Sequence, residues 1–173
     1  MSRPQAANCV EEFATIISNL YGDEYLCSPS AEELKQIVKL HKEVHKIVDM
    51  FSSLDCMHTR WKNYPKVWQG AYQTGRYSPG PTAALEALCE YHLLFWHASF
   101  GYAGSLNDLN ILNLTLFLDS LLDGSFEKME EDANIVPFKI GDDVLNQLYV
   151  LVDGIYPRYS QFVKGLNSPI TPQ

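Results

Sequence analysis

The fold of this chain is decided by two short apolar stretches that each lead to an aspartate. Residues 51–57, Phe-Ser-Ser-Leu-Asp-Cys-Met, alternate between apolar and polar side chains, which predicts a strand carrying Asp55. Residues 148–152, Leu-Tyr-Val-Leu-Val, form a short apolar run typical of a central buried strand, and Asp153 follows directly. If the two strands are neighbours in one sheet, their carboxylates come together despite a separation of 98 residues.

The segments around these strands predict further helices and strands. Upstream, apolar residues recur at helical spacing over 10–20, and a capping box of Ser30 and Glu33 opens a second helix that continues to about Val48. The elements expected downstream are a hairpin of strands 82–90 and 93–100, an apolar helix over 106–122, an exposed acidic excursion over 127–143 with a short strand at 136–140, and a short helix over 158–164. This order predicts an α/β fold: a mixed sheet flanked by helices, with a helical N-terminal extension.

Composition and charge limit the classes of function. With 173 residues, of which 46% are hydrophobic, the chain has the size of one domain with a real core. The net charge of −8 argues against a basic module held on a phosphate backbone by bulk charge. The four cysteines include no CxxC pair, the N-terminus has no apolar signal region, and no run is long and apolar enough for a spanning helix. We therefore expect an intracellular protein that is neither secreted nor bound in a membrane.

Three groups of side chains are candidates for chemistry. Asp55 and Asp153, converging from strand ends, would suit a hard divalent cation, although an Asp after a strand is commonly a turn residue. Asp108 begins the apolar helix, where a capping box with Ser105 explains it equally well. His41 and His45 share a helical face, but the intervening glutamate is misplaced for a zinc protease, which favours surface histidines without a catalytic role.

A stretch of basic and aromatic residues is the candidate nucleic-acid surface. No Asp or Glu occurs from Cys56 through Leu85. Within this stretch the basic residues alternate with the aromatic ones, in the order Arg60, Trp61, Lys62, Tyr64, Lys66, Trp68, Tyr72, Arg76 and Tyr77. Such a mixture suits a phosphate backbone and its exposed bases. The alternative is a long loop that its aromatic residues anchor to the core.

Four ordered motifs resemble one family. They are Ser53-Leu-Asp55-Cys-Met-His58, the pair Trp61-Lys-Asn-Tyr-Pro65 and Trp68-Gln-Gly-Ala-Tyr72, Gly101-Tyr-Ala-Gly-Ser-Leu-Asn-Asp108, and Val152-Asp-Gly-Ile-Tyr-Pro157. Over residues 51–165 the chain resembles PIF/Harbinger-type transposases, and within them the plant-transposon-protein subgroup. The resemblance implies an RNase H-like fold in which a DDE triad of acids binds two Mg²⁺ or Mn²⁺ ions. It also implies an enzyme that cuts DNA at transposon ends and joins the cut end to a target.

The resemblance also implies roles for individual residues and for partners. Asp55 corresponds to the first catalytic acid and Asp153 to the second, both as metal ligands, and Asp108 and His58 match family positions near the site. DNA would be the substrate, a separate Myb/SANT-like DNA-binding protein a partner, and the nucleus the location. The expected DNA-binding residues are Arg60, Trp61, Lys62, Lys66 and Arg76.

The third acid of the triad has no counterpart. None of the 20 residues after Asp153 is Asp or Glu, so the last catalytic helix is expected to be missing and activity to be impaired. The expected organisation is a helical extension over 1–50, an incomplete nuclease domain over 51–165 and a disordered tail over 166–173. Two other functions remain open: a domesticated, non-catalytic remnant that binds DNA or protein, and an α/β phosphoesterase of another substrate.

Overall fold

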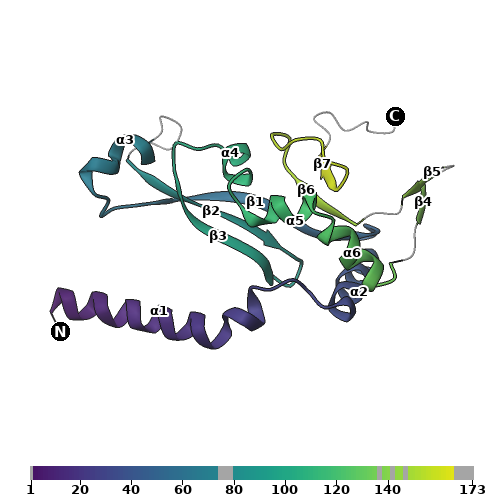
Figure 1. Ribbon diagram of the computed structural model, residues 1–173, viewed down its shortest axis with the longest axis horizontal. Coiled ribbons are helices and arrows are strands. Elements are labelled where there is room, and N and C mark those ends of the chain that lie inside the picture. Colours follow the sequence, from purple (N-terminus) through teal and green to yellow (C-terminus); the bar gives the residue numbers. More distant parts are fainter. Residues whose placement is uncertain (1, 74–79, 136–137, 141–142, 146–147, 166–173) are drawn as a thin grey trace.

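A five-stranded mixed sheet forms the centre of the molecule in the computed structural model, which describes residues 2–73, 80–135 and 148–165 and the backbone of 138–140 and 143–145 (Figure 1). The strand order is β3-β2-β1-β6-β7. The strands are β1 (Met50–Arg60), β2 (Thr82–Cys89), β3 (Phe95–Ala103), β6 (Tyr149–Val152) and β7 (Phe162–Lys164). The first three pair antiparallel, whereas β6 is parallel to both β1 and β7. β4 (Phe138–Ile140) and β5 (Asp143–Leu145) form a separate small hairpin.

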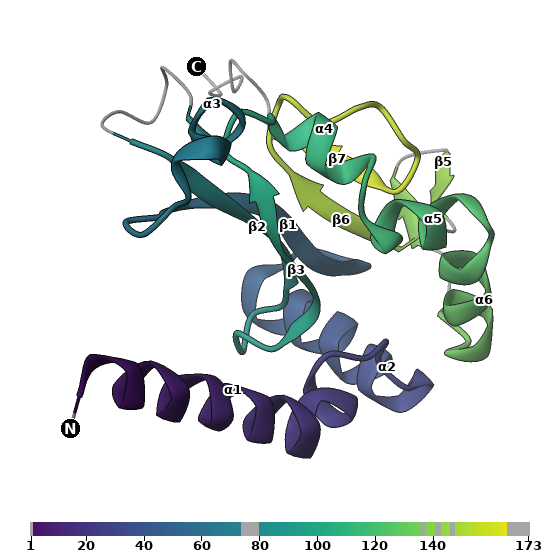
Figure 2. The ribbon, with the colours of Figure 1, turned by 60° about the vertical axis from the view of Figure 1, so that its left-hand side comes forward.

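Helices precede the sheet and cover one of its faces. The helices are α1 (Arg3–Tyr25), α2 (Ala31–Leu40), the π-helix η1 (His41–His45), the 3-10 helix η2 (Lys66–Trp68), α3 (Gln69–Tyr72), α4 (Asp108–Leu112), α5 (Leu116–Leu122) and α6 (Ser125–Asp132). Figure 2 shows α4 and α5 running along the sheet beside β6 and β7, with α1 and α2 at the opposite end. The predicted mixed sheet flanked by helices, with a helix at the N-terminus, is confirmed.

The hydrophobic core lies between the helix-covered face of the sheet and helices α2, α4, α5 and α6. Buried side chains include Leu34, Ile37, Phe51, Leu54, Leu88, Leu112, Phe117, Leu121, Phe126, Val150 and Phe162. The capping box that opens α2 is present, because the Ser30 backbone N–H donates to Glu33 Oε2 at 2.8 Å. In contrast, α1 buries none of its residues. Within the described residues, the helices lack the combination of length and apolar character needed to cross a bilayer.

The apolar helix expected over 106–122 is interrupted, and that prediction was wrong in its continuity. Two separate helices, α4 and α5, occupy the segment. Between them the Asn113 side chain donates to the Leu109 carbonyl at 2.7 Å, and the Thr115 hydroxyl donates to the Leu112 carbonyl at 3.0 Å. These local side-chain bonds satisfy carbonyls at the end of α4 and allow the chain to turn.

Two predictions further along the chain were also wrong. Residues 158–164 include the strand β7 rather than a helix, because Val150 N–H donates to the Gln161 carbonyl at 2.8 Å and β7 extends the parallel sheet. The acidic segment from Glu127 onward begins with α6, whose Phe126 and Glu130 are buried. Tertiary packing of the few apolar residues in this segment outweighs its polar composition. The hairpin of β2 and β3 is confirmed, and the short strand expected at 136–140 is present as β4.

Candidate metal site and nucleic-acid surface

The parallel pairing of β1 with β6 sets the positions of the two aspartates. Ser53 of β1 pairs with Leu151 of β6. Two residues further on, Asp55 lies within β1, whereas Asp153 directly follows Val152, the last residue of β6. Side chains alternate between the faces of a strand, so residues two apart lie on the same face. The register therefore places Asp55 beside the end of β6, where Asp153 follows, so the predicted neighbouring of the two strands is confirmed.

Each aspartate is also held by a local hydrogen bond. Asp55 Oδ1 accepts from the Cys56 backbone N–H at 2.8 Å, and Asp153 Oδ1 accepts from the Ile155 backbone N–H at 2.9 Å. The second bond makes Asp153 a turn residue as well, which is the alternative that the sequence left open. Both side chains are exposed, and within the described residues the second oxygen of each has no hydrogen-bond partner. These oxygens are available to a ligand from solution.

The two faces of the sheet differ in burial, and Asp55 lies on the more exposed one. Along β1, Leu54 is buried and Cys56 and His58 are half-buried, whereas Ser53, Asp55, Met57 and Thr59 are exposed. Met57 pairs with Leu85, which pairs with Phe100, and on the other side Leu151 pairs with Val163. We call the face that carries Asp55, Met57, Thr59, Phe100 and Val163 the open face. Phe100 is 66% exposed and Met57 58%.

The two ancillary candidates do not share the open face. His58 is three residues from Asp55 and so on the other face of β1, where its Nδ1 lies 3.2 Å from the Thr82 hydroxyl. Asp108 is the first residue of α4, on the helix-covered side, and its charge raises the pKa of both Cys56 and Tyr156. The N-cap of α4 is Asn107 rather than the expected Ser105, because the Asn107 side chain accepts from the Asn110 N–H at 2.9 Å.

A contact between β1 and the loop after β6 supports the aspartate pair from the covered face. The buried Tyr156 hydroxyl lies 3.5 Å from Cys56 Sγ, and Lys164 Nζ donates to the carbonyls of Gly154 and Tyr156. Burial raises the pKa of the Cys56 thiol to about 12, against a smaller opposing effect of the hydrogen bond from Tyr156. Sequence reasoning missed Lys164, although its position after a short apolar run was visible.

A buried carboxylate on the covered face was also missed. Glu86 is fully buried, and one of its oxygens lies 3.2 Å from His97 Nε2 while the other has no partner among the described residues. Glu86 pairs with Cys56 across the sheet, so it points away from the face of Asp55. It cannot complete a ligand set with the two aspartates. The neighbours of Glu86 in the sequence are apolar, so the sequence gave no indication of its contact with His97.

The basic and aromatic stretch forms an aromatic cluster at the far end of β1. Ring centroids of Trp61 and Tyr72 are 5.1 Å apart, those of Trp61 and Trp68 5.9 Å, and Trp68 stacks on Tyr72 with an angle of 18°. The Tyr72 hydroxyl donates to the Gly101 carbonyl at 3.2 Å, which ties the cluster to β3. Trp68 stays 49% exposed, and Arg60, Lys62 and Lys66 are exposed. The aromatic residues anchor the segment, as the second interpretation predicts, while the exposed cations leave the nucleic-acid surface a prediction. Arg76 lies outside the described residues.

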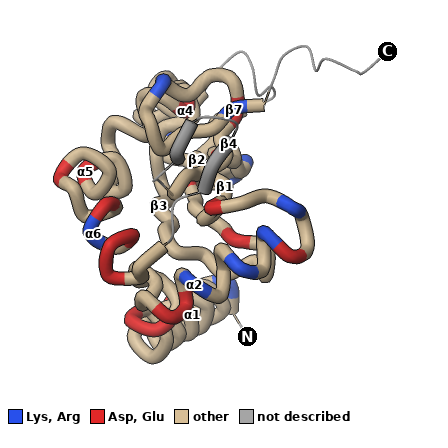
Figure 3. Tube along the Cα trace, turned by 90° about the vertical axis from the view of Figure 1, so that its right-hand side faces the viewer, with Lys and Arg blue, Asp and Glu red and all other residues tan. Residues whose placement is uncertain are grey.

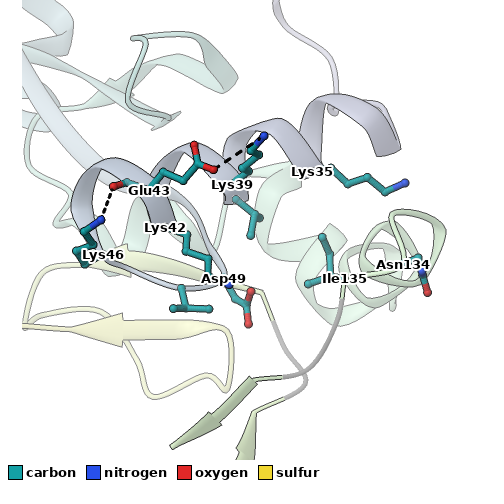
Figure 4. Close-up of a pocket in the computed structure, with 10 residues that line it drawn as sticks. Lys35, Lys39, Lys42, Glu43, Lys46, Asp49, Asn134 and Ile135 are labelled. Carbon is teal, nitrogen blue, oxygen red and sulfur yellow. Dashed lines mark hydrogen bonds and ion pairs between the residues drawn. The ribbon is translucent and has the colours of Figure 1, made fainter.

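A row of lysines on α2 and η1 is a second cationic surface, which the sequence analysis did not use. Lys35, Lys39, Lys42 and Lys46 line one pocket, and their helical spacing was a readable signal (Figure 4). One acid partly offsets the row, because Lys39 Nζ lies 3.9 Å from Glu43 Oε1. Lys46 Nζ donates to the backbone carbonyl of Glu43 at 2.9 Å. Figure 3 shows basic positions along α2 and the segment after it, and acidic positions on α6.

The histidines and acids that the structure describes do not form a closed metal site. The prediction of surface histidines is confirmed for His45, which is exposed, and is wrong for His41, which is buried with its Nδ1 2.8 Å from the Met50 carbonyl. Among the described residues, no group of three or more His, Cys, Asp or Glu side chains is arranged to hold a metal ion. Asp55 and Asp153 fit a cation such as Mg²⁺ that binds one or two carboxylates and takes its other ligands from water and phosphate.

Comparison with known proteins gives one result. A family model described as plant transposon protein matches residues 23–173. Searches of curated proteins and of solved structures return no match.

Proposed function

Because this chain belongs to the plant transposon protein family, we propose that it is a PIF/Harbinger-type, RNase H-like DDE nuclease domain that acts on DNA. Asp55 and Asp153 hold a divalent cation, Mg²⁺ or Mn²⁺, against the phosphate backbone. The observation that supports the proposal is the parallel pairing of β1 with β6, because Asp55 lies on β1 and Asp153 directly follows β6. A bound cation of this kind polarises a phosphodiester and activates the attacking oxygen.

The protein's own residues have distinct tasks in this proposal. Each aspartate presents one oxygen to the cation, while the backbone N–H that binds its other oxygen fixes the orientation of the carboxylate. Tyr156 and Lys164 position the loop that carries Asp153. Arg60, Lys62 and Lys66 neutralise phosphates next to the site, which gives affinity without sequence recognition. Sequence recognition would then come from a separate Myb/SANT-like protein, in the nucleus.

Metal binding by aspartate variants tests the proposal. Mn²⁺ is titrated into the full chain and followed by electron paramagnetic resonance. We expect Asp55→Asn and Asp153→Asn each to weaken binding by about tenfold or more, because each removes an anionic oxygen ligand. The matched control is Asp23→Asn, at an exposed position of α1. Equal affinity in all four proteins would contradict the site assignment.

One observation favours a second candidate, a non-catalytic remnant that binds DNA. Among the described residues, no group of three or more potential ligands could hold a metal ion. In that case DNA retention should fall with rising salt and be abolished by charge reversal at Arg60 and Lys62. Asp153→Asn should leave retention unchanged, and supercoiled DNA should stay intact in Mn²⁺. Cleavage by the wild-type chain that Asp153→Asn abolishes would decide for the nuclease.

A further inference from the structure

We propose that the pocket between the aromatic cluster and β3 binds a single unpaired nucleobase of the DNA. The pocket has a volume of about 340 Å³ and is lined by Thr59, Arg60, Trp61, Tyr72, Ala83, Phe100 and Gly101. This volume is within the range of about 300–1,000 Å³ that is usual for small-ligand pockets. The inference rests on the proposed function only in taking DNA as the ligand.

The walls of the pocket suit the flat faces of a base. Trp61 and Tyr72 meet edge to face with ring centroids 5.1 Å apart, so they form an angled aromatic wall. Phe100, from another strand, is 66% exposed and offers an unused aromatic surface. Stacking on aromatic side chains tolerates every base, because each base has a π face. The guanidinium of Arg60 can add a cation–π contact.

Charge selects a nucleic acid over an apolar peptide as the occupant. Arg60 lines the pocket, and Lys62 and Lys66 are exposed on the adjoining segment. No Asp or Glu occurs in the sequence from Cys56 through Leu85, which contributes five of the seven lining residues, Thr59, Arg60, Trp61, Tyr72 and Ala83. The chain as a whole carries a net charge of −8, so this cationic surface is local. An anionic backbone that carries aromatic bases matches both properties at once.

The pocket and Asp55 lie on the same face of the sheet. Thr59 and Asp55 are four residues apart on β1, so their side chains point the same way at a distance of about 13 Å. That distance equals about four base steps of stacked DNA. A strand whose phosphate lies at Asp55 can therefore deliver a nearby base to the pocket. The base must be unpaired, because a base inside a duplex has both faces covered by its neighbours.

Oligonucleotide binding with and without bases tests this inference. Affinities of the full chain for an oligothymidylate and for an abasic oligonucleotide of equal length are compared by fluorescence anisotropy in EDTA, so that the metal site does not contribute. We expect the oligothymidylate to bind at least about tenfold more tightly, because stacking one base on an aromatic side chain typically raises the affinity by about that factor. Phe100→Ala should bring the ratio close to one, and Trp61→Phe should retain most of it.

Two control variants separate stacking from folding and from charge. Phe13→Ala removes a phenyl ring that is 65% exposed on α1, which matches Phe100 in exposure, and should leave the ratio unchanged. Lys62→Glu should weaken both oligonucleotides together and leave the ratio unchanged. Because Phe100 is exposed, its variant should keep the melting temperature of the wild type.

The outcomes distinguish this inference from the proposed function. Equal wild-type affinity for both oligonucleotides, or an unchanged ratio in Phe100→Ala, overturns the base pocket and leaves DNA binding by the cations intact. Failure to bind either oligonucleotide overturns the base pocket and the DNA binding by the cations, whereas the metal site is tested separately by the Mn²⁺ titration. Self-association of the chain that Phe100→Ala abolishes, seen by sedimentation without DNA, would assign the pocket to a second copy and overturn the base as its occupant.

Discussion

Tyr156 and Cys56 join β1 to the loop after β6, with the tyrosine hydroxyl 3.5 Å from the cysteine sulfur. Cys56 directly follows Asp55, and Tyr156 is three residues after Asp153. The contact lies on the covered face, directly behind the strand that presents Asp55 to solvent. Through it, two segments 100 residues apart hold the candidate metal ligands in a fixed relation.

Removal of the Tyr156 hydroxyl should lower stability moderately. Tyr156→Phe keeps the ring that packs on Phe162, with centroids 6.0 Å apart, and loses only the hydrogen bond to Cys56. We expect a loss of about 1 kcal/mol in the free energy of unfolding, measured by urea denaturation. The control is Tyr159→Phe, since the Tyr159 ring also packs on Phe162 at 5.5 Å. An equal loss in both variants would show that the Cys56 contact contributes nothing specific.

The four cysteines should differ strongly in reactivity. Cys9 and Cys27 are exposed, whereas burial raises the pKa of Cys56 to about 12 and also raises the pKa of Cys89. With that pKa, roughly one Cys56 thiol in ten thousand is ionised at pH 8, and the thiolate is the reactive form. Iodoacetamide labelling mapped by mass spectrometry should therefore modify Cys9 and Cys27 first. Labelling of Cys56 at the rate of Cys9 in the folded chain would contradict this expectation, and urea should equalise the rates.

Gly104 should tolerate no side chain. A Cβ at this position would meet the side chain and carbonyl of Thr82, and would lie 2.7 Å from the Tyr72 carbonyl. Because backbone atoms cannot move aside easily, Gly104→Ala should destabilise the chain by about 1–3 kcal/mol, measured by thermal unfolding. Gly70→Ala is the control: no atom lies within 4 Å of its Cβ, and it should be neutral or slightly stabilising.

Glu130 should make the folded state less stable as the pH rises through the pKa of its carboxyl group. Burial, and then the nearby acids, raise its pKa above the ordinary 4.5, against the opposing hydrogen bond from the Leu148 N–H at 3.0 Å. Folding therefore favours the protonated form. The stabilisation is fully present below the unfolded-state pKa and is lost as pH rises through the folded-state pKa.

Glu130→Gln should accordingly raise the melting temperature by a few degrees at pH 7, because the amide oxygen keeps the bond to Leu148 without a buried charge. At pH 4 the difference from the wild type should shrink. Glu12→Gln, at an exposed position of α1 away from Glu130, should have no such pH-dependent effect. A lower melting temperature of Glu130→Gln at pH 7 would contradict the assigned direction of the pKa shift.

Local sequence patterns were sufficient to predict the helices and strands that have a clear repeat or a clear capping signal. The alternation at 51–57, the capping box at Ser30 and the hairpin runs all correspond to observed elements. One error occurs where a tertiary contact outweighs local preference, and another where side chains bond to the backbone of the preceding turn. Residues 162–164 form a strand because β6 offers a free edge, and the helix expected over 106–122 breaks where Asn113 and Thr115 bond to the backbone.

The sequence by itself determined that Asp55 and Asp153 are carried at two strands, and that the cations near Trp61 lack neighbouring acids. Only the tertiary structure decided that β1 and β6 are parallel neighbours, and that His58 and Glu86 face away from Asp55. It also decided that Phe100 completes the pocket of Trp61 and Tyr72. The physical reason is that side chains alternate along a strand with a period of two, whereas strand pairing depends on hydrogen bonds and burial between distant segments.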